Sequence, residues 1–402
     1  MSNTKPTSNP QHFARPALAD KLSNDLVGDS VLNDASNGLF LAGPRRTGKS
    51  EFLKNDLTQA LEQRGLLVMY VDLWSDKARP PGELIAKAVG DAYRSHLGKV
   101  AKVALDVGLD QVTVGGMKID LRNIGKVTGL TLAEAFKLLH TQSKKRLVLI
   151  VDEAQHALTT DDGLNAMVAL KSARDQLKEK GQSQLLLVMS GSHKDKLARL
   201  VNSVSAPFWG SSVDNLPTLG EAYARHICQS LKCEKPELLS LQDTAVIEAF
   251  THCGERPQFL FKIIKEANMA SATPADFSAQ LITLAKQSQQ HDRDQFVQQF
   301  AALPKEQQAV LSLLFEKGND FAPFDQAAMA YYAQALGSSL TASNVQVILD
   351  SMQKQDFPAE PPLIWKSARG RYELYDQTLS EVYSYLKAAG QWPPKPATGD
   401  KT

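Results

Sequence analysis

Short apolar runs separated by longer stretches with helical spacing make up the first half of the chain. Five runs have the length and composition of strands: Gly38–Ala42, Leu66–Leu73, Arg146–Val151, Gln184–Met189 and, more weakly, Val213–Leu216. Buried strands that alternate with helices imply parallel pairing. We therefore expect an α/β sheet over this part of the chain.

The intervening segments predict two helices and an insertion. The segment after Gly48 has an apolar face at helical spacing, made by Phe52, Leu53, Leu57, Ala60 and Leu61. Another helix should begin at Thr131, because Thr131 and Glu134 have the spacing of a capping box. Between these helices, apolar residues alternate around Gly115-Gly116, namely Val112, Val114, Met117, Ile119 and Leu121. This alternation predicts a small β-hairpin that protrudes from the sheet domain.

The second half of the chain predicts two helical modules. From Leu219 to about Gln290 the pattern is purely helical, which is typical of a small bundle. Three further helices and two short strands are then expected, at Pro304–Glu316, Asp325–Leu336, Ala342–Met352, Leu363–Lys366 and Tyr372–Leu374. Three helices followed by a hairpin indicate a winged helix-turn-helix.

Length and composition fit such an organisation. The chain has 402 residues, 43% apolar and 22% charged, which suggests about two or three domains, each with its own core. Disorder, collagen and coiled coil are excluded as overall descriptions. The expected parts are a disordered tail at 1–10, a P-loop domain at 11–218 with the hairpin near 111–122, a helical lid at 219–290, a winged helix at 291–388 and a disordered tail at 389–402.

Charge and targeting signals exclude several classes of protein. The 45 Lys and Arg nearly balance the 44 Asp and Glu, which argues against a surface built entirely for nucleic acid but leaves a local patch possible. No apolar run approaches the ~20 residues that cross a bilayer, and Met1–Pro10 has no signal core. Three scattered cysteines do not suggest a disulfide framework. We therefore expect a cytoplasmic protein without membrane contact.

One motif carries the strongest chemical signal. Gly43-Pro44-Arg45-Arg46-Thr47-Gly48-Lys49-Ser50 fits the phosphate-binding pattern G-x-x-x-x-G-K-[ST], between a predicted strand and a predicted helix. The glycines let successive backbone N–H groups face phosphate oxygens, and the helix adds the positive end of its dipole. Lys49 can neutralise the β and γ phosphates, and the Ser50 hydroxyl can ligate Mg²⁺. The alternative interpretation is a strand-to-helix turn with a basic tip.

Two other strands end in residues that suit the same site. The run Leu147–Val151 ends in Asp152 and Glu153, at the sheet edge where α/β proteins bind ligands. Asp152 can then hold the Mg²⁺ shell, and Glu153 can deprotonate the attacking water. The run ending at Met189 continues into Ser190 and Ser192, either of which could reach the γ-phosphate; a simple turn is the alternative.

With these motifs, the chain resembles AAA+ ATPases, in the clade of archaeal and bacterial initiator-like and STAND-like ATPases. The resemblance extends from about Phe13 to Leu386. It rests on the loop above and on four further stretches: Val151-Asp152-Glu153-Ala154-Gln155, Ser190-Gly191-Ser192, Gly254-Glu255-Arg256-Pro257 and Arg369-Gly370-Arg371-Tyr372-Glu373-Leu374-Tyr375-Asp376.

The resemblance implies further site residues. Phe13 and Arg15, in Phe13-Ala14-Arg15-Pro16, would lie against the adenine, and Arg256 would be a sensor in the lid that contacts the γ-phosphate. Relatives commonly carry an arginine finger after the aromatic-Gly pair that follows the sensor strand. Ser211 stands there in this chain, which leaves Arg199 as a weak substitute. Because such a finger accelerates hydrolysis by orders of magnitude, we expect slow turnover by an isolated chain.

Two other features have open or unfavourable interpretations. A zinc site made by His226, Cys228, Cys233, His252 and Cys253 is disfavoured, since no paired C-x-x-C occurs. The winged helix offers Lys366, Arg369 and Arg371 to DNA, yet residues 291–402 carry 10 Lys and Arg against 13 Asp and Glu. Docking to a protein and contact with DNA both remain open.

The leading expectation is an ATP- and Mg²⁺-dependent AAA+ ATPase that drives or gates a movement of the lid and winged helix, with a homo-oligomer completed through the ATP site. A nucleotide-gated switch that rarely cleaves ATP and binds a partner protein or DNA is the alternative. A helper in DNA loading or transposition is a third hypothesis. Roles in defence, mobile elements and replication fit equally well, because contacts with partners decide among them.

Overall fold

The computed structural model describes residues 12–28, 35–76, 78–96, 111–114, 117–120, 130–192, 194–271, 273–353, 363–368, 370–374 and 378–394. The chain divides into two compact units. The first contains Met1–Asp243 and Glu255–Phe259, and the second contains Thr244–Gly254 and Leu260–Thr402. Each is described by itself.

A parallel sheet of five strands forms the centre of the first unit within the described residues. Its strands are β1 (Leu39–Ala42), β2 (Leu67–Asp72), β5 (Leu147–Asp152), β8 (Leu185–Gly191) and β9 (Asp214–Asn215). Their order across the sheet is β2-β5-β8-β1-β9. All five expected strands are confirmed, including the weak candidate at β9. Their carboxyl ends therefore meet along one edge of the sheet.

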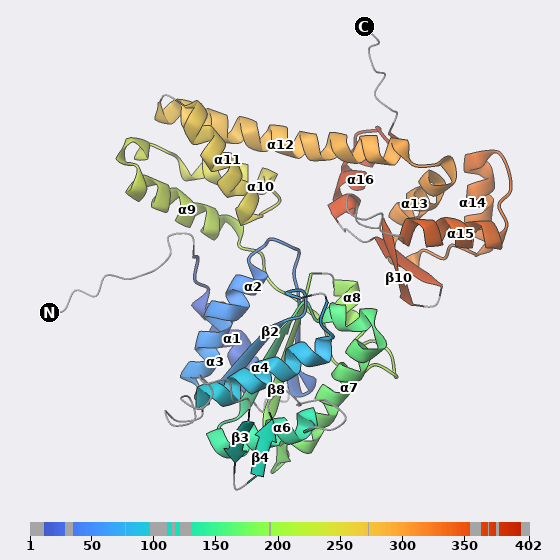
Figure 1. Cartoon of the computed structure of the whole chain (residues 1–402). Helices are drawn as coiled ribbons and strands as arrows, with labels where there is room; N and C mark the ends of the chain where they lie inside the picture. The colour runs from blue at the N-terminus through green and yellow to red at the C-terminus, as the bar shows by residue number, and fades with distance from the viewer. Residues whose placement is uncertain are drawn as a thin grey trace. The chain divides into compact units, whose positions relative to one another are not determined.

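Helices cover both faces of this sheet (Figure 1). One face packs against α1 (Pro16–Val27), α2 (Lys49–Phe52), the π turn η2 (Leu53–Leu57) and α3 (Thr58–Gln63). The other packs against α4 (Pro81–His96), α6 (Leu132–Ser143) and α7 (Asp161–Gln176). The unit also contains η1 (Ala35–Asn37), β3 (Gln111–Val114), β4 (Met117–Asp120), η4 (Ala154–Thr159), β6 (Lys178–Glu179), β7 (Gln182–Ser183), α8 (Lys194–Ala198), α9 (Gly220–Glu234) and η5 (Pro236–Leu238).

The alternation of side chains along each strand produces two separate cores. On β5, Leu147, Leu149 and Val151 belong to the core under α4, α6 and α7. Val148 and Ile150 belong to the core under α1 and α3. Because both faces are covered, the central strands are apolar throughout, which is why they appear in the sequence as continuous apolar runs.

Three local predictions are confirmed in the first unit. Thr131 caps α6, since its Oγ1 accepts the Glu134 N–H while the Glu134 carboxylate accepts the Thr131 N–H. Strands β3 and β4 pair antiparallel, with Val114 opposite Met117, as the predicted hairpin requires. The helix after the phosphate loop buries its predicted apolar face. Helical spacing did not predict that this helix contains the π turn η2. Asp56 lies in that turn and is only 9% exposed.

The second unit is mostly helical (Figure 1). Its elements are α10 (Asp243–His252), α11 (Pro257–Ala270), α12 (Pro274–Ala302), α13 (Lys305–Lys317), η6 (Gly318–Asp320), α14 (Gln326–Leu336), α15 (Ala342–Gln353), β10 (Ile364–Ala368), β11 (Arg371–Leu374) and α16 (Thr378–Ala388). Strands β10 and β11 pair antiparallel, with Ile364 opposite Leu374. Three helices followed by a hairpin are therefore present in the predicted order. The expected boundary between 290 and 291 falls inside the continuous helix α12.

The end of the described chain belongs to the core of this unit. The Trp392 ring centroid lies 4.7 Å from that of Phe300, 4.7 Å from that of Tyr383 and 5.6 Å from that of Phe315. The prediction of a disordered tail from residue 389 is therefore wrong at Trp392, because one large aromatic outweighs the polar composition around it. Residues 1–10 and 395–402 lie outside the described residues.

We predict that Trp392→Ala lowers the unfolding free energy of the second unit by about 2 kcal/mol, because it removes a ring packed against several others. Chemical denaturation followed by circular dichroism measures the loss. Trp392→Phe keeps an aromatic ring and should lose less than half as much. Equal stability of Trp392→Ala and wild type would contradict the packing role.

Candidate functional site

The loop Gly43–Ser50 joins the end of β1 to the start of α2. The Gly43 N–H donates to the Gly191 carbonyl oxygen at 3.0 Å, which ties the loop to the neighbouring strand β8. Gly48 has a φ of 83° and Arg46 a φ of 66°, so both adopt the left-handed conformation. Glycine adopts it without a Cβ penalty, and Gly48 thereby directs the chain into the helix that begins at Lys49. The predicted phosphate loop thus has its strand-loop-helix context.

Lys49 lies between two carboxylates at the carboxyl end of β5. Its Nζ donates to Asp152 Oδ1 at 2.6 Å and to Glu153 Oε1 at 2.9 Å. The neighbouring Ser50 hydroxyl donates to Asp152 Oδ2 at 2.5 Å. The structure therefore brings together the four residues that the sequence assigned to phosphate, magnesium and water.

Asp152 is fully buried and surrounded by donors. Besides Lys49 and Ser50, it accepts hydrogen bonds from the Ser190 hydroxyl and from the Tyr70 hydroxyl, the latter at 2.8 Å. Burial alone would raise the pKa of Asp152, but the charge and hydrogen bond of Lys49, with the two serine hydroxyls, lower it to about 2. Burial raises the pKa of Tyr70, so its hydroxyl stays protonated as a donor. Asp152 is consequently an anion at neutral pH.

Glu153 has its own set of donors. Its Oε2 accepts from the Ser192 hydroxyl at 3.0 Å and from Gln155 Nε2 at 2.5 Å, while Lys49 contacts Oε1. Burial opposes ionisation, yet the charge of Lys49 and these hydrogen bonds leave the pKa of Glu153 below its ordinary value. Glu153 also has a φ of 54°, an uncommon conformation for a side chain of this size. The carboxylate is therefore ionised and held from two sides.

No family model matches the chain, and no curated protein matches it. Among solved structures, the ORC2 protein of Aeropyrum pernix in its ADP form is similar at 13% identity and a TM-score of 0.57, over 96% of this chain and 97% of that chain. The chain has the AAA+ fold of the initiator-like ATPases. A Walker-type ATPase of Pyrococcus abyssi is similar at 13% identity and a TM-score of 0.49, over 95% and 99% of the two chains.

The expected adenine segment of this AAA+ fold lies beside two distant parts of the chain. The Phe13 ring centroid lies 5.8 Å from that of Tyr223, edge to face, and 5.5 Å from that of His226, both on α9. Arg15 donates to the Pro217 carbonyl oxygen at 2.9 Å and stacks over the Phe52 ring. The segment is thus fixed between the helix after the phosphate loop and the start of α9. Its contact with adenine remains a prediction.

Arg256, the expected sensor, lies near the phosphate loop. Its Cζ is 5.5 Å from the centroid of the Phe259 ring, and Arg46 of the loop approaches the same ring at 5.3 Å. Residues 255–259 belong to the first unit, whereas the rest of α11 belongs to the second. The structure therefore brings Arg256 close to the loop through Phe259, which the sequence did not indicate, and the sensor role of Arg256 stays a prediction.

Sequence reasoning also missed Tyr70, Gln155 and Trp74. Gln155 occurs in the stretch that carries the resemblance, two residues after Glu153, but its spacing alone did not reveal a hydrogen bond to that carboxylate. Arg45 contacts Ser192 Oγ at 3.4 Å and lies over the Trp74 ring. Such contacts join side chains from separate strands and loops, so no local pattern could indicate them.

The two candidate positions for an arginine finger differ in burial. Ser211, at the position where relatives carry an arginine, is 8% exposed, and Arg199 is partly buried beyond α8. Within the described ranges, no three His, Cys, Asp or Glu side chains gather as a metal-binding group. Nor does any described helix combine the length and apolar character that a bilayer crossing requires.

We predict that Lys49→Met lowers the unfolding free energy of the nucleotide-free protein by about 3 kcal/mol at pH 7, because the buried Asp152 and the partly buried Glu153 then lack their cation. Adding Glu153→Gln should recover part of this loss, since it removes one of the two charges. Denaturant titration measures both effects. Arg94→Ala, which removes an exposed ion pair with Asp91, should cost under about 1 kcal/mol. A Lys49→Met variant as stable as wild type would contradict this account.

Proposed function

We propose that the protein binds Mg²⁺-ATP at the loop Gly43–Ser50 and hydrolyses it. The observation that carries the proposal is the position of Lys49, whose Nζ lies within 2.9 Å of Glu153 and 2.6 Å of Asp152. A cation at the first turn of a helix, after a loop rich in backbone donors, is suited to the β and γ phosphates. The AAA+ fold supports a nucleotide ligand, since the similar A. pernix protein is described in an ADP form.

The residues present suit Mg²⁺. The ion prefers hard oxygen ligands, and the Ser50 hydroxyl and the ionised Asp152 carboxylate lie in direct contact. Ser50 and Asp152 would hold the ion, which would neutralise charge on the phosphates. Tyr70 and Ser190 fix the orientation of Asp152 by donating to its two oxygens.

Hydrolysis requires a base for the attacking water. Glu153 is ionised, and Ser192 and Gln155 orient its Oε2. It would align the water and accept its proton as the water oxygen bonds to the γ-phosphorus and the bond to the ADP oxygen breaks. Ser190 or Ser192, together with Arg256, would report the γ-phosphate to the lid and winged helix.

Steady-state ATP turnover tests this proposal across a protein concentration series. Lys49→Ala should abolish turnover through lost binding, and Glu153→Gln should reduce it at least about 100-fold while retaining ATP, because it removes only the base. A specific rate that rises with concentration indicates a site completed between subunits. Full turnover by both variants would refute the assignment.

A nucleotide-gated switch is the second candidate function, and Ser211 favours it. This buried serine cannot supply a cation to the site of a neighbouring subunit. Such a protein would retain ATP, cleave it rarely and bind its partner according to the nucleotide. Near-zero turnover at every concentration, with partner binding that depends on ATP, would favour the switch over a working ATPase.

For the winged helix, we propose a protein partner rather than DNA. Residues 318–353, which include α14 and α15, contain no Lys, Arg or His and three Asp. The side chain of Val347 on α15 is 68% exposed, so this helix offers an apolar group where a DNA reader would offer cations. Of the three expected wing cations, Arg371 is exposed at the start of β11, whereas Arg369 lies outside the described residues.

We predict DNA binding no tighter than about 10 μM at physiological salt, with a shallow dependence on salt, because few phosphate contacts are available. Fluorescence anisotropy with a duplex oligonucleotide, in ATP and in ADP, measures it. Arg371→Ala should change the affinity less than about twofold. Submicromolar, strongly salt-dependent binding in ATP would instead favour the DNA-loading hypothesis.

A further inference from the structure

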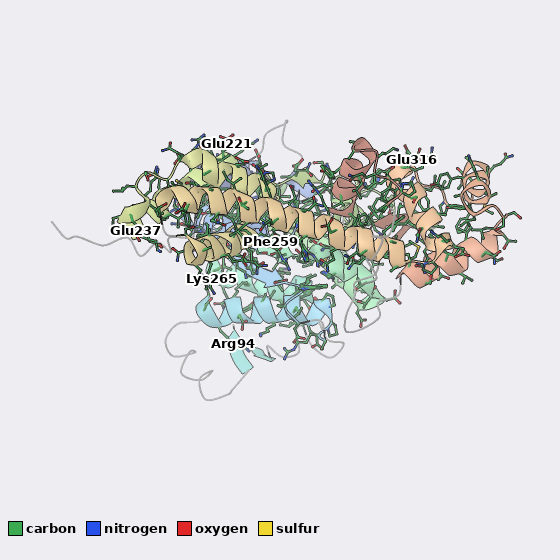
Figure 2. All side chains as sticks on the ribbon, turned by 90° about the horizontal axis from the view of Figure 1, so that it is seen from above. Arg94, Glu221, Glu237, Phe259, Lys265 and Glu316 are labelled. Atoms are coloured by element: carbon green, nitrogen blue, oxygen red, sulfur yellow. The ribbon has the colours of Figure 1, made fainter. Side chains whose placement is uncertain are left out.

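Two arginines from distant parts of the chain share one aromatic ring. Arg46, in the phosphate loop, places its Cζ 5.3 Å from the centroid of Phe259, and Arg256 places its Cζ at 5.5 Å. Phe259, which is labelled in Figure 2, is partly buried. It lies in the first turn of α11. All three residues belong to the first unit. Both distances lie within the range at which a cation interacts favourably with an aromatic face.

The Phe259 ring contacts both guanidiniums, but a ring does not neutralise their positive charge. Among the residues that the structure describes, neither Arg46 nor Arg256 has a carboxylate partner. Lys49 is the opposite case, since two carboxylates bind it. A phosphate that approaches Lys49 competes with the carboxylates of Asp152 and Glu153 for the ammonium group. A phosphate that approaches the two arginines meets no such competition. Their uncompensated charges beside the loop favour an anion there.

An aromatic ring is well suited to positioning two guanidiniums for an anion. A guanidinium above a ring keeps the N–H donors at its rim available for phosphate oxygens. The ring also restricts two long side chains before a ligand arrives, so they lose less conformational entropy on binding. The contact therefore prepares the arginines for an anion and does not block them.

We propose that Phe259 is a positioning residue that holds Arg46 and Arg256 ready for the terminal phosphate, and so sets the preference for a nucleoside triphosphate over a diphosphate. This inference rests on the proposed function. The loop backbone suits the phosphates that both nucleotides share, and Lys49 can reach the β phosphate of either nucleotide. The two arginines add charge for the group that only the triphosphate has, so loss of Phe259 should affect the triphosphate more.

Isothermal titration with ADP and with a non-hydrolysable ATP analogue, both with Mg²⁺, tests the proposal on the full chain. Phe259→Leu keeps apolar bulk but removes the ring. We expect it to weaken binding of the ATP analogue by about 3- to 10-fold and binding of ADP by less than about 2-fold. Phe259→Tyr retains the ring and should keep the wild-type ratio of the two affinities.

Two further variants separate this role from a structural one. Phe261→Leu removes a ring two positions along the same helix, in the part of α11 that belongs to the second unit. It should leave the affinity ratio unchanged. In an Arg46→Ala, Arg256→Ala background, Phe259→Leu should have no further effect on the ratio, because the side chains that it positions are absent.

The outcomes are distinct. A wild-type ratio in Phe259→Leu, in a protein that binds ATP normally, would overturn this inference and leave the proposed function intact. Equal loss for ADP and the ATP analogue would also overturn it, as would a further effect of Phe259→Leu in the double-arginine background. Failure of the wild type to bind either nucleotide would overturn the proposed function and this inference together.

Discussion

The contact of Lys49 with Asp152 and Glu153 organises the candidate site. A fully buried aspartate would be costly alone, and the ammonium of Lys49 at 2.6 Å stabilises its charged form. The contact also brings three strands together. Strand β1 leads into the loop that carries Lys49, β5 ends at Asp152 just before Glu153, and β8 carries Ser190 and is followed by Ser192. The order of the strands in the sheet therefore brings the residues of the candidate site together.

The charged side chains of the candidate site are of two kinds, those paired with an opposite charge and those that contact an aromatic ring. The charges of Lys49, Asp152 and Glu153 are compensated by one another, and neutral donors bind the two carboxylates. Arg46 and Arg256 lie over an aromatic ring and keep their charge available. A triphosphate carries enough negative charge to engage both groups. The combination suits a site that distinguishes its nucleotide by the terminal phosphate.

The chain also connects this site covalently to the second unit. Helix α11 begins within the first unit at Pro257–Phe259 and continues in the second from Leu260. A change at Phe259 therefore acts on the first turn of a helix that the other unit contains. That unit has an aromatic core around Trp392, and its helices α14 and α15 contain no Lys, Arg or His.

The sequence alone predicted the structural features that depend on residues close together in the chain. The five strands, the phosphate loop, the Thr131 cap and the three-helix-and-hairpin order each depend on residues close together in the chain. Tertiary structure decided what depends on distance: Tyr70 and Gln155 on the carboxylates, Phe259 beneath two arginines and Trp392 in a core. Apolar periodicity records which face of an element is buried, but it does not record which side chain of another element lies against it. Those contacts arise only when strands and helices far apart in the sequence pack together.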